Sequence, residues 1–478
     1  MAQKQNYSRV LIAALLLSGS FVAVLNQTLM ITAIPPIMKE MSISANTGQW
    51  LTTVFMLVNG IMIPITAFLI EKFTTRQLFI TAMSVFAFGT LVCGMADNFS
   101  ILILGRIIQS AGAGVMLPLM QTVFLLIFPV ERRGTAMGYI GLVISFAPAL
   151  GPTLSGWVTS NYEWRFLFWF IFPLSILMIF IAYKIMRNVT ELKNPKVDPL
   201  SIMLSSLGFG GLLYGFTSAG NNGWASPLTL IVLAVGTASL VIFIKRQLSM
   251  EHPMLEFRVF QQRIFMISTM IGMVGFLGLI GSETLIPLFM QNMRGFTAME
   301  AGLVLLPGAL ISGLMAPITG RIFDRIGARY LAITGLTIMS TATLAFVLID
   351  SATSMTYLMV TYAVRMFGFS MVMMPVNTAG LNQMPPKLIP HGAAMTNTMR
   401  QMAASVGTAV LVTTMTTTAQ TARHAAEHPD ILGVKVAFFL IFLLSVGALG
   451  LSFFIRKTAP PTDEEWDAQQ REKTRQSG

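Results

Sequence analysis

One acidic residue lies far inside an apolar stretch of this sequence, and it is the strongest candidate for chemistry. Glu283 comes about twenty residues after Arg263 and about eleven before Arg294. At 1.5 Å per residue, it would lie roughly 16 Å from the end marked by Arg294. A carboxyl group at that depth in a membrane is costly and marks a functional site by default. Apolar surroundings favour its protonated form and a nearby cation favours the carboxylate, so we predict that Glu283 is a proton-coupling site. A hydrogen-bonded structural role is the alternative.

Three arginines lie within or at the ends of other apolar stretches. Arg106 would place a permanent positive charge inside the fold, where it can bias a nearby acid or take part in a proton relay. We predict that Arg106 contributes to coupling, with bonding to helix carbonyls as the alternative. For Arg365, structural and functional roles both stay open. Arg400 is expected near the cytoplasmic end of its stretch, where a structural role is favoured.

An amphipathic substrate needs a few polar side chains among apolar ones. The sequence offers eight candidates for such a cavity: Asn26, Gln27, Asn59, Gln121, Gln291, Arg365, Asn377 and Asn397. The single cysteine, the absence of a Cys/His cluster and the absence of a GxxxxGK[ST] motif argue against redox, metal and ATP chemistry. We expect no metal and no cofactor, with a proton gradient as the energy source.

The elements that must position these residues are long apolar stretches. The chain has 478 residues, of which 54% are hydrophobic and 11% charged, whereas a soluble domain carries about 25% charged residues. Stretches long enough to cross a bilayer as helices fall at about 10–31, 47–70, 77–96, 99–127, 134–159, 166–186, 200–219, 227–245, 264–291, 301–320, 329–349, 354–376, 392–418 and 434–455. We predict an all-α integral membrane protein with fourteen transmembrane helices.

The positive charges give an orientation. The net charge is +11, which by itself could indicate nucleic-acid binding. With an even number of spans and cytoplasmic termini, 23 of the 31 Lys and Arg residues fall in cytoplasmic segments and 5 on the opposite face. This asymmetry follows the positive-inside rule. We therefore predict a multi-pass protein of the bacterial plasma membrane with both termini in the cytoplasm and no nucleic-acid partner.

Two long polar connections and an internal repeat divide the chain. The sequence Pro-Ile-Thr followed by an acid-base pair begins at Pro64 and recurs at Pro317, an offset of 253 residues. We predict a six-helix bundle in residues 1–190, two linker helices in 191–262, a second six-helix bundle in 263–457 and a cytoplasmic tail in 458–478. Parallel repeats of six spans are the layout of major facilitator transporters.

The second copy of the repeat, residues 320–329, resembles the GxLxDRxGRR loop of the major facilitator superfamily. The resemblance implies a conformational latch formed by Gly320, Asp324, Arg325, Gly327 and Arg329. The first copy has Glu71 and Arg76 at the matching positions but departs from the pattern elsewhere. Ala67 replaces the first glycine and Thr74 the second, which predicts a weaker latch in the first half.

A Gly- and Pro-rich segment resembles the GxxxGPxxGG motif of the superfamily's antiporters. Its residues are Gly141, Pro148, Gly151, Pro152 and Gly156. Prolines disturb a helix and small residues allow close packing, so we expect a rigid hinge; an ordinary packing helix is the alternative. Much of the remaining chain is similar to the fourteen-span drug:proton antiporters, and most of all to the lincomycin-resistance type. Many relatives carry Asp where this chain has Asn26, so coupling must be sited elsewhere.

The resemblance implies proton-coupled export of amphipathic drugs, with lincosamides among the candidates, by alternating access. The expected partners are small amphipathic substrates, protons and membrane lipids, and the protein is expected to be a monomer. An exporter or flippase of an endogenous lipid or metabolite, or an uptake symporter, would have the same fold, although the antiporter motif argues against uptake. A receptor or scaffold would not need Glu283. An enzyme is disfavoured because no nucleophile, metal or paired-acid constellation lies in the stretches.

Overall fold

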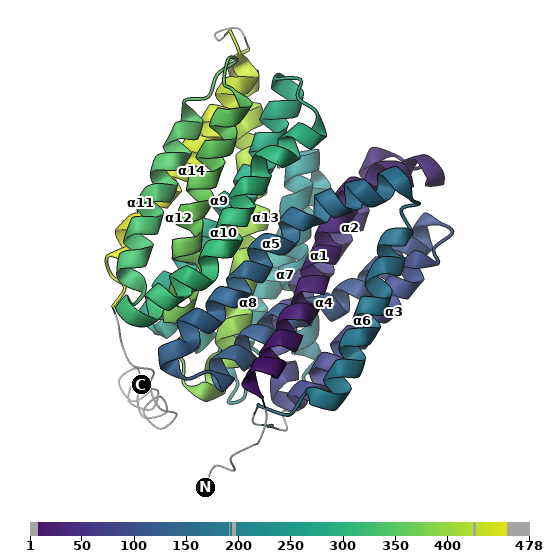
Figure 1. Ribbon diagram of the computed structural model, residues 1–478, viewed down its shortest axis with the longest axis vertical. Coiled ribbons are helices and arrows are strands. Elements are labelled where there is room, and N and C mark those ends of the chain that lie inside the picture. The colour runs from purple at the N-terminus through teal and green to yellow at the C-terminus, as the bar shows by residue number, and fades with distance from the viewer. Residues whose placement is uncertain (1–7, 191, 194–196, 424–426, 457–478) are drawn as a thin grey trace. The chain divides into compact units, whose positions relative to one another are not determined.

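The computed structural model describes residues 8–190, 192–193, 197–423 and 427–456, and every regular element in these ranges is helical. The long helices, shown in Figure 1, are α1 Arg9–Met41, α2 Ala45–Lys72, α3 Thr75–Gly94, α4 Phe99–Ile127, α5 Arg133–Asn161, α6 Phe166–Ile185, α7 Pro199–Asn222, α8 Pro227–Ser249, α9 Arg263–Leu288, α10 Ala298–Ile326, α11 Ala328–Val347, α12 Met355–Leu381, α13 Ile389–Thr421 and α14 Pro429–Ser452. In the part of the chain described, these fourteen helices are long and apolar enough to cross a membrane. The predicted number of spans is confirmed.

Short polar residues set several helix starts. Thr74 accepts a hydrogen bond from the Gln77 N–H while the Gln77 side chain accepts one from the Thr74 N–H, which forms a capping box before α3. Thr297 and Glu300 form the same box before α10. Such caps satisfy backbone donors that have no partner within the first helical turn. The first box lies in the loop of the first repeat copy, and the second lies at the opposite end of α10 from the second copy.

The first helix is longer than its apolar pattern predicts. Its expected end was near residue 31, but α1 continues through Pro35 and Pro36 to Met41. Near its end, Glu40 accepts hydrogen bonds from the Trp164 indole N–H at 2.7 Å and from the Arg165 guanidinium at 2.6 Å. This ion pair is formed with the loop between α5 and α6, so the polar end of α1 is held by tertiary contacts.

We expect Glu40→Gln to lower the thermal stability slightly at neutral pH. The hydrogen bond from Arg165 holds the pKa of Glu40 below its usual range, and the bond from Trp164 acts in the same direction. A depressed carboxyl pKa contributes stability above the pKa of the unfolded state, and this contribution is lost as the pH falls through the folded-state value. Because 45% of the Glu40 side chain is exposed, the effect should be at most about 1 kcal/mol.

The measurement is the melting temperature of purified wild-type and variant protein between pH 7 and pH 3. The wild type should melt higher at pH 7, and the difference should vanish in acid. Glu163→Gln, at an exposed acid of the same loop, is the matched control and should change neither value. A difference that persists at the lowest pH would contradict the assignment to the Glu40 charge.

The contacts divide the chain into two compact units. Unit 1 comprises the described residues up to Pro129 together with those of Val143–Asp198, and unit 2 comprises Val130–Leu142 and the described residues from Pro199 onward. Helix α5 therefore contributes its first turns to unit 2 and its remainder to unit 1. In unit 1, α3 packs against α4 and α6, while in unit 2, α12 packs against α9, α10 and α11.

The predicted linker helices α7 and α8 pack against each other and belong to unit 2. Helix α7 also packs against α13. The indole N–H of Trp224, just after α7, donates to the Thr413 hydroxyl at 2.7 Å, and the Ser405 hydroxyl donates to the Leu213 carbonyl at 3.2 Å. These bonds attach the pair to the C-terminal part of the chain.

Candidate functional site

Glu283 lies on α9, five residues before the helix ends at Leu288. The helix continues directly into a π-helical turn, Phe289–Met293, a feature that often occurs at functional sites. The Glu283 side chain is half-buried, and in the part of the chain described it forms no salt bridge. A carboxyl group with some accessible surface and no salt bridge can exchange a proton, and the coupling role of Glu283 stays a prediction.

The charge that acts on Glu283 is Arg365 of α12. The side chain of Arg365 is completely buried, and its Nε donates to the Thr343 hydroxyl of α11 at 3.2 Å. Its Nη1 and Nη2 have no hydrogen-bond partner. Gly278 of α9 makes room for it, because a Cβ at that position would lie 2.5 Å from Nη2. A buried cation with two unsatisfied nitrogens can receive a carboxylate that moves toward it.

Tyr362 belongs to the same group of residues, although the sequence pattern did not single it out. It precedes Arg365 by three positions on α12, is 1% exposed and interacts electrostatically with both Glu283 and Arg365. Residues three apart lie on one face of a helix, so this spacing was the available signal. Thr343 carried no comparable signal, because its link to Arg365 comes from packing of α11 against α12.

Arg106 forms a separate network in unit 1. Its Nε donates to the Leu51 carbonyl at 3.1 Å, its Nη1 donates to Gln109 Oε1 at 2.7 Å, and the guanidinium lies 4.2 Å from the centroid of the Phe55 ring. Gln109 in turn donates to the Thr90 hydroxyl at 2.8 Å. These bonds connect α4 with α2 and α3, so Arg106 stabilises the interior of unit 1. Its predicted part in proton coupling stays a prediction.

The remaining cavity candidates are distributed over both units. Asn26, Gln27, Asn59 and Gln121 lie in unit 1, and Gln291, Asn377 and Asn397 lie in unit 2. Asn26, Gln121, Asn377 and Asn397 are buried, Gln27 and Asn59 are half-buried, and Gln291 is exposed within the π-helical turn. The Nδ2 atoms of Asn26 and Asn377 have no hydrogen-bond partner among the described residues, and buried amides need polar partners, which makes these two better candidates for substrate contact than Gln291.

Arg400 lies deeper than expected. Helix α13 begins at Ile389, so Arg400 is its twelfth residue rather than a residue near its end. Its side chain is 3% exposed. The apolar pattern located the start of this helix at residue 392, and the additional buried turn places Arg400 within the fold.

The second copy of the repeat binds the start of α5. Asp324, on the last turns of α10, accepts hydrogen bonds from the Gly134 N–H at 2.7 Å, the Thr135 N–H at 2.9 Å and the Thr135 hydroxyl at 2.5 Å. A carboxylate at a helix N-terminus is favoured by the free N–H groups and by the helix dipole. A Cβ on Gly320 would overlap the Gly134 carbonyl oxygen, so the glycine is what allows this approach.

The loop after Asp324 depends on Gly327. This residue has φ of +80° and separates α10 from α11, a conformation that favours glycine. Its counterpart in the first copy, Thr74, has φ of −63° and caps α3 instead. The two loops therefore differ in backbone as well as in sequence. Arg325 and Arg329 are exposed.

In the first copy, the acid pairs within unit 1. Glu71 forms an ion pair with Lys193 of the segment after α6, and the Lys193 N–H donates to the Glu71 carbonyl at 2.9 Å. Arg76 lies over the Tyr183 ring, 4.6 Å from its centroid. Neither residue carries the helix-capping contact that Asp324 makes. The sequence had no signal for Lys193, because the pair joins residues 122 positions apart.

The Gly- and Pro-rich motif lies inside α5, which continues through Pro148 and Pro152. Two of its glycines are in close contact: a Cβ on Gly141 would lie 2.7 Å from Met374 Cγ, and a Cβ on Gly151 would overlap the Thr28 hydroxyl of α1. Gly156 has no atom within 4 Å of a built Cβ. The close packing predicted for this motif is thus present at Gly141 and Gly151 but not at Gly156.

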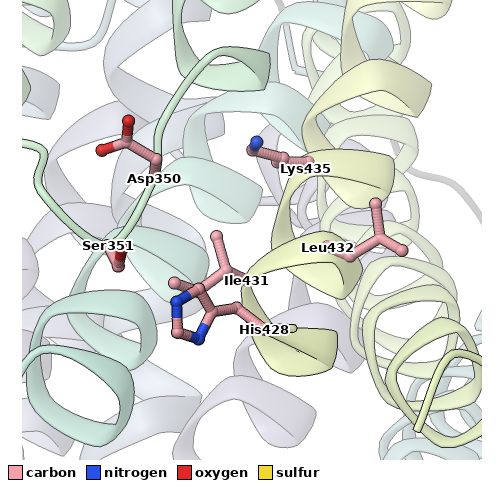
Figure 2. Close-up of a pocket in the computed structure, with 6 residues that line it drawn as sticks. All are labelled: Asp350, Ser351, His428, Ile431, Leu432 and Lys435. Atoms are coloured by element: carbon pink, nitrogen blue, oxygen red, sulfur yellow. The ribbon is translucent and has the colours of Figure 1, made fainter. Parts of the chain in front are cut away.

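A separate pocket of about 180 Å³ lies at helix ends in unit 2. Figure 2 shows Asp350 and Lys435 on two sides of it, with His428 and Ile431 between them. Hydrogen bonds from the Ala352 N–H and the Thr353 hydroxyl, with Lys435 nearby, hold the pKa of Asp350 below its usual range. None of the predicted site residues lines this pocket. Within the described ranges, no group of three His, Cys, Asp or Glu residues could hold a metal ion.

The fourteen candidate spans of the described residues indicate a multi-pass membrane protein. The family model described as Major Facilitator Superfamily matches residues 16–408, and the chain belongs to this family. The predicted all-α major facilitator fold is confirmed. Members of the family are transporters, which also confirms the prediction that the chain is not an enzyme.

Curated relatives cover almost the whole chain. It is 52% identical to "Uncharacterized MFS-type transporter YcnB" of Bacillus subtilis (strain 168), over 97% of this chain and 98% of the relative. It is 42% identical to "Lincomycin resistance protein LmrB" of Listeria innocua, over 94% and 96% of the two chains. Among solved structures, the human organic anion transporter MFSD10 matches with a TM-score of 0.63 and 14% identity, covering 91% of this chain and 99% of that one. The last match shows the fold alone.

Proposed function

We propose that this protein exports amphipathic drugs from bacterial cells in exchange for protons, by alternating access. The observation that carries the proposal is Glu283, a half-buried carboxyl group inside unit 2 with Arg365 as its nearby charge. The similarity to proteins named for lincomycin resistance supports an antibiotic as substrate. The distribution of Lys and Arg residues supports cytoplasmic termini.

In the proposed mechanism, protonation of Glu283 decides how strongly it interacts with Arg365. The neutral acid leaves the guanidinium without a counter-charge, whereas the carboxylate is attracted to it, and this attraction is strong where water is excluded. A cationic or amphipathic substrate favours the carboxylate and a proton removes it, so the two compete for one site. Arg106 acts in unit 1 as a fixed positive charge, and no cofactor or metal takes part.

The proposed conformational change involves the Asp324 contact. The carboxylate bonds to the first turn of α5, and this same helix carries Gly141 and Gly151 further along. Because α5 contributes to both units, breaking and forming these bonds would control how α5 moves with unit 2. In this proposal Asp324 acts as a latch.

Drug accumulation in energised cells tests the proposal. Cells that produce the protein should accumulate less lincomycin and less of a cationic dye than cells without it. A protonophore should abolish the difference, whereas depletion of ATP under conditions that preserve the proton gradient should leave it intact. Efflux that follows ATP and survives the protonophore would overturn proton coupling, and unchanged accumulation of every compound would overturn drug export.

A further inference from the structure

Arg400 is a buried cation for which the described part of the chain supplies no counter-charge. It lies about 16 Å from the first residue of α13 at 1.5 Å per residue, and it is 3% exposed. Its Nε and Nη2 have no hydrogen-bond partner. The carboxyl group of Glu283 acts on Arg365, and among the residues that the structure describes no charged group acts on Arg400. An unpaired buried charge is strongly unfavourable, so a group that supplies negative charge would stabilise this side chain.

Two further polar groups without partners lie on the helices beside it. The guanidinium lies over Gly272 of α9, where a Cβ would be 3.6 Å from Nε. Ser268 is one turn earlier on that face of α9, and its hydroxyl is unsatisfied. Ser268 packs against Gly380 of α12, and the unsatisfied Nδ2 of Asn377 lies one turn before Gly380 on the same face. The side chains of Ser268 and Asn377 are at least nine-tenths buried.

The residues around Arg400, Ser268 and Asn377 are small or apolar. A Cβ on Gly275, one turn after Gly272, would meet only Met373 Sδ at 3.9 Å and Phe369 Cε2 at 4.0 Å. The glycines leave side-chain space next to the guanidinium, and the thioether and the aromatic ring offer apolar contact. A thioether adapts readily to ligands of different shape. Hydrogen-bond donors on one side and apolar atoms on the other suit an amphipathic molecule with an oxyanion.

We propose that Arg400, assisted by Ser268 and Asn377, binds the oxyanion of an amphipathic substrate. A guanidinium pairs well with carboxylates and phosphates because its N–H groups match their two oxygens. The assignment rests on the proposed transport function and adds a second substrate class to its cationic drugs: apolar molecules that carry a carboxylate or phosphate group. Arg400 thus selects the substrate, while Glu283 responds to the proton.

A matched ligand pair tests the oxyanion. The probes are 11-(dansylamino)undecanoic acid and its uncharged primary amide, and binding to the full-length protein in phosphatidylcholine nanodiscs is followed by dansyl fluorescence. Loss of one charge-assisted pair should weaken binding of the acid by Arg400→Gln about tenfold or more. Binding of the amide should stay unchanged, and Arg400→Lys should restore much of the affinity for the acid. Arg423→Gln, at an exposed arginine after α13, is the matched control.

Other outcomes identify the ligand source or overturn the site. If phosphatidylglycerol in the nanodisc competes with the acid in the wild type but not in Arg400→Gln, the oxyanion is that of a lipid headgroup; absence of competition assigns it to the free carboxylate. Equal weakening of acid and amide, or no weakening of either, would overturn the assignment. Protonophore-sensitive efflux of a cationic dye by Arg400→Gln would show that drug export holds even where the oxyanion site has failed.

Discussion

Glu283→Gln is expected to abolish gradient-driven efflux while the protein still folds and binds substrate. Glutamine keeps the size and hydrogen-bonding capacity of the protonated acid but cannot release a proton. The carboxylate that is attracted to the Arg365 guanidinium would therefore never form, and the exchange of drug for proton would stop. In proteoliposomes with an imposed pH gradient, we expect substrate transport to fall to the level of protein-free vesicles, a loss of about a hundredfold or more if the coupling group is removed.

Two measurements distinguish loss of coupling from loss of structure. Drug binding to the detergent-purified variant should stay within about threefold of the wild type, or about 0.7 kcal/mol, and Glu283→Asp should keep part of the transport. Asp97→Asn, at an exposed acid just after α3, removes a carboxylate without touching the site and should transport normally. Normal gradient-driven transport by Glu283→Gln would remove Glu283 from the mechanism.

Asp324→Asn is expected to slow transport about tenfold or more, since a charge-assisted hydrogen bond is worth about 1.5–3 kcal/mol. The carboxylate accepts three hydrogen bonds at the start of α5, and asparagine keeps only one acceptor oxygen for them. The state in which Asp324 bonds to the start of α5 would lose stability relative to other states. The substrate site would then alternate less completely between the two sides of the membrane. The measurement is the rate of drug uptake into inverted vesicles at equal amounts of protein.

Glu300→Gln is the matched control for this latch. Glu300 also caps a helix N-terminus, at the other end of α10, where the hydrogen bonds that it accepts from Thr297 are exposed. The Glu300→Gln variant should be slightly less stable than the wild type and should transport at the same rate. If both variants transport equally well, Asp324 is a structural cap and has no part in alternation.

Much of the fold could be predicted because each span carries its own signal. Apolar length, capping residues and the charge asymmetry are local properties, and most predicted ends lie within a few residues of the helices. The exception is α1, whose polar last turns are held by Glu40 and the loop after α5. A tertiary ion pair of this kind leaves no trace in the local apolar pattern.

The candidate site could be predicted only in part. Glu283 and Arg365 were recognisable as buried charges, but their proximity depends on how α9 packs against α12. Sequence spacing contains no information on the packing that brings together two residues 82 positions apart in the chain. Arg106 was predicted to join the same chemistry, with bonding to helix carbonyls as the alternative, and its Nε does donate to the Leu51 carbonyl. The sequence could not identify that carbonyl as the partner. Pairing across helices, rather than residue type, was the missing information.

The buried Arg400 has a consequence for how the protein is made. Arginine at the centre of a helix opposes membrane insertion by about 2.5–3.5 kcal/mol, and the stretch that contains α13 is the least hydrophobic of the fourteen candidate spans. Helices α7, α9 and α12, which pack against α13, are all synthesised before it. The earlier helices therefore provide much of the environment that α13 lacks in lipid, and α14 adds to it later. The order of synthesis becomes part of what makes a helix with a buried charge compatible with the bilayer.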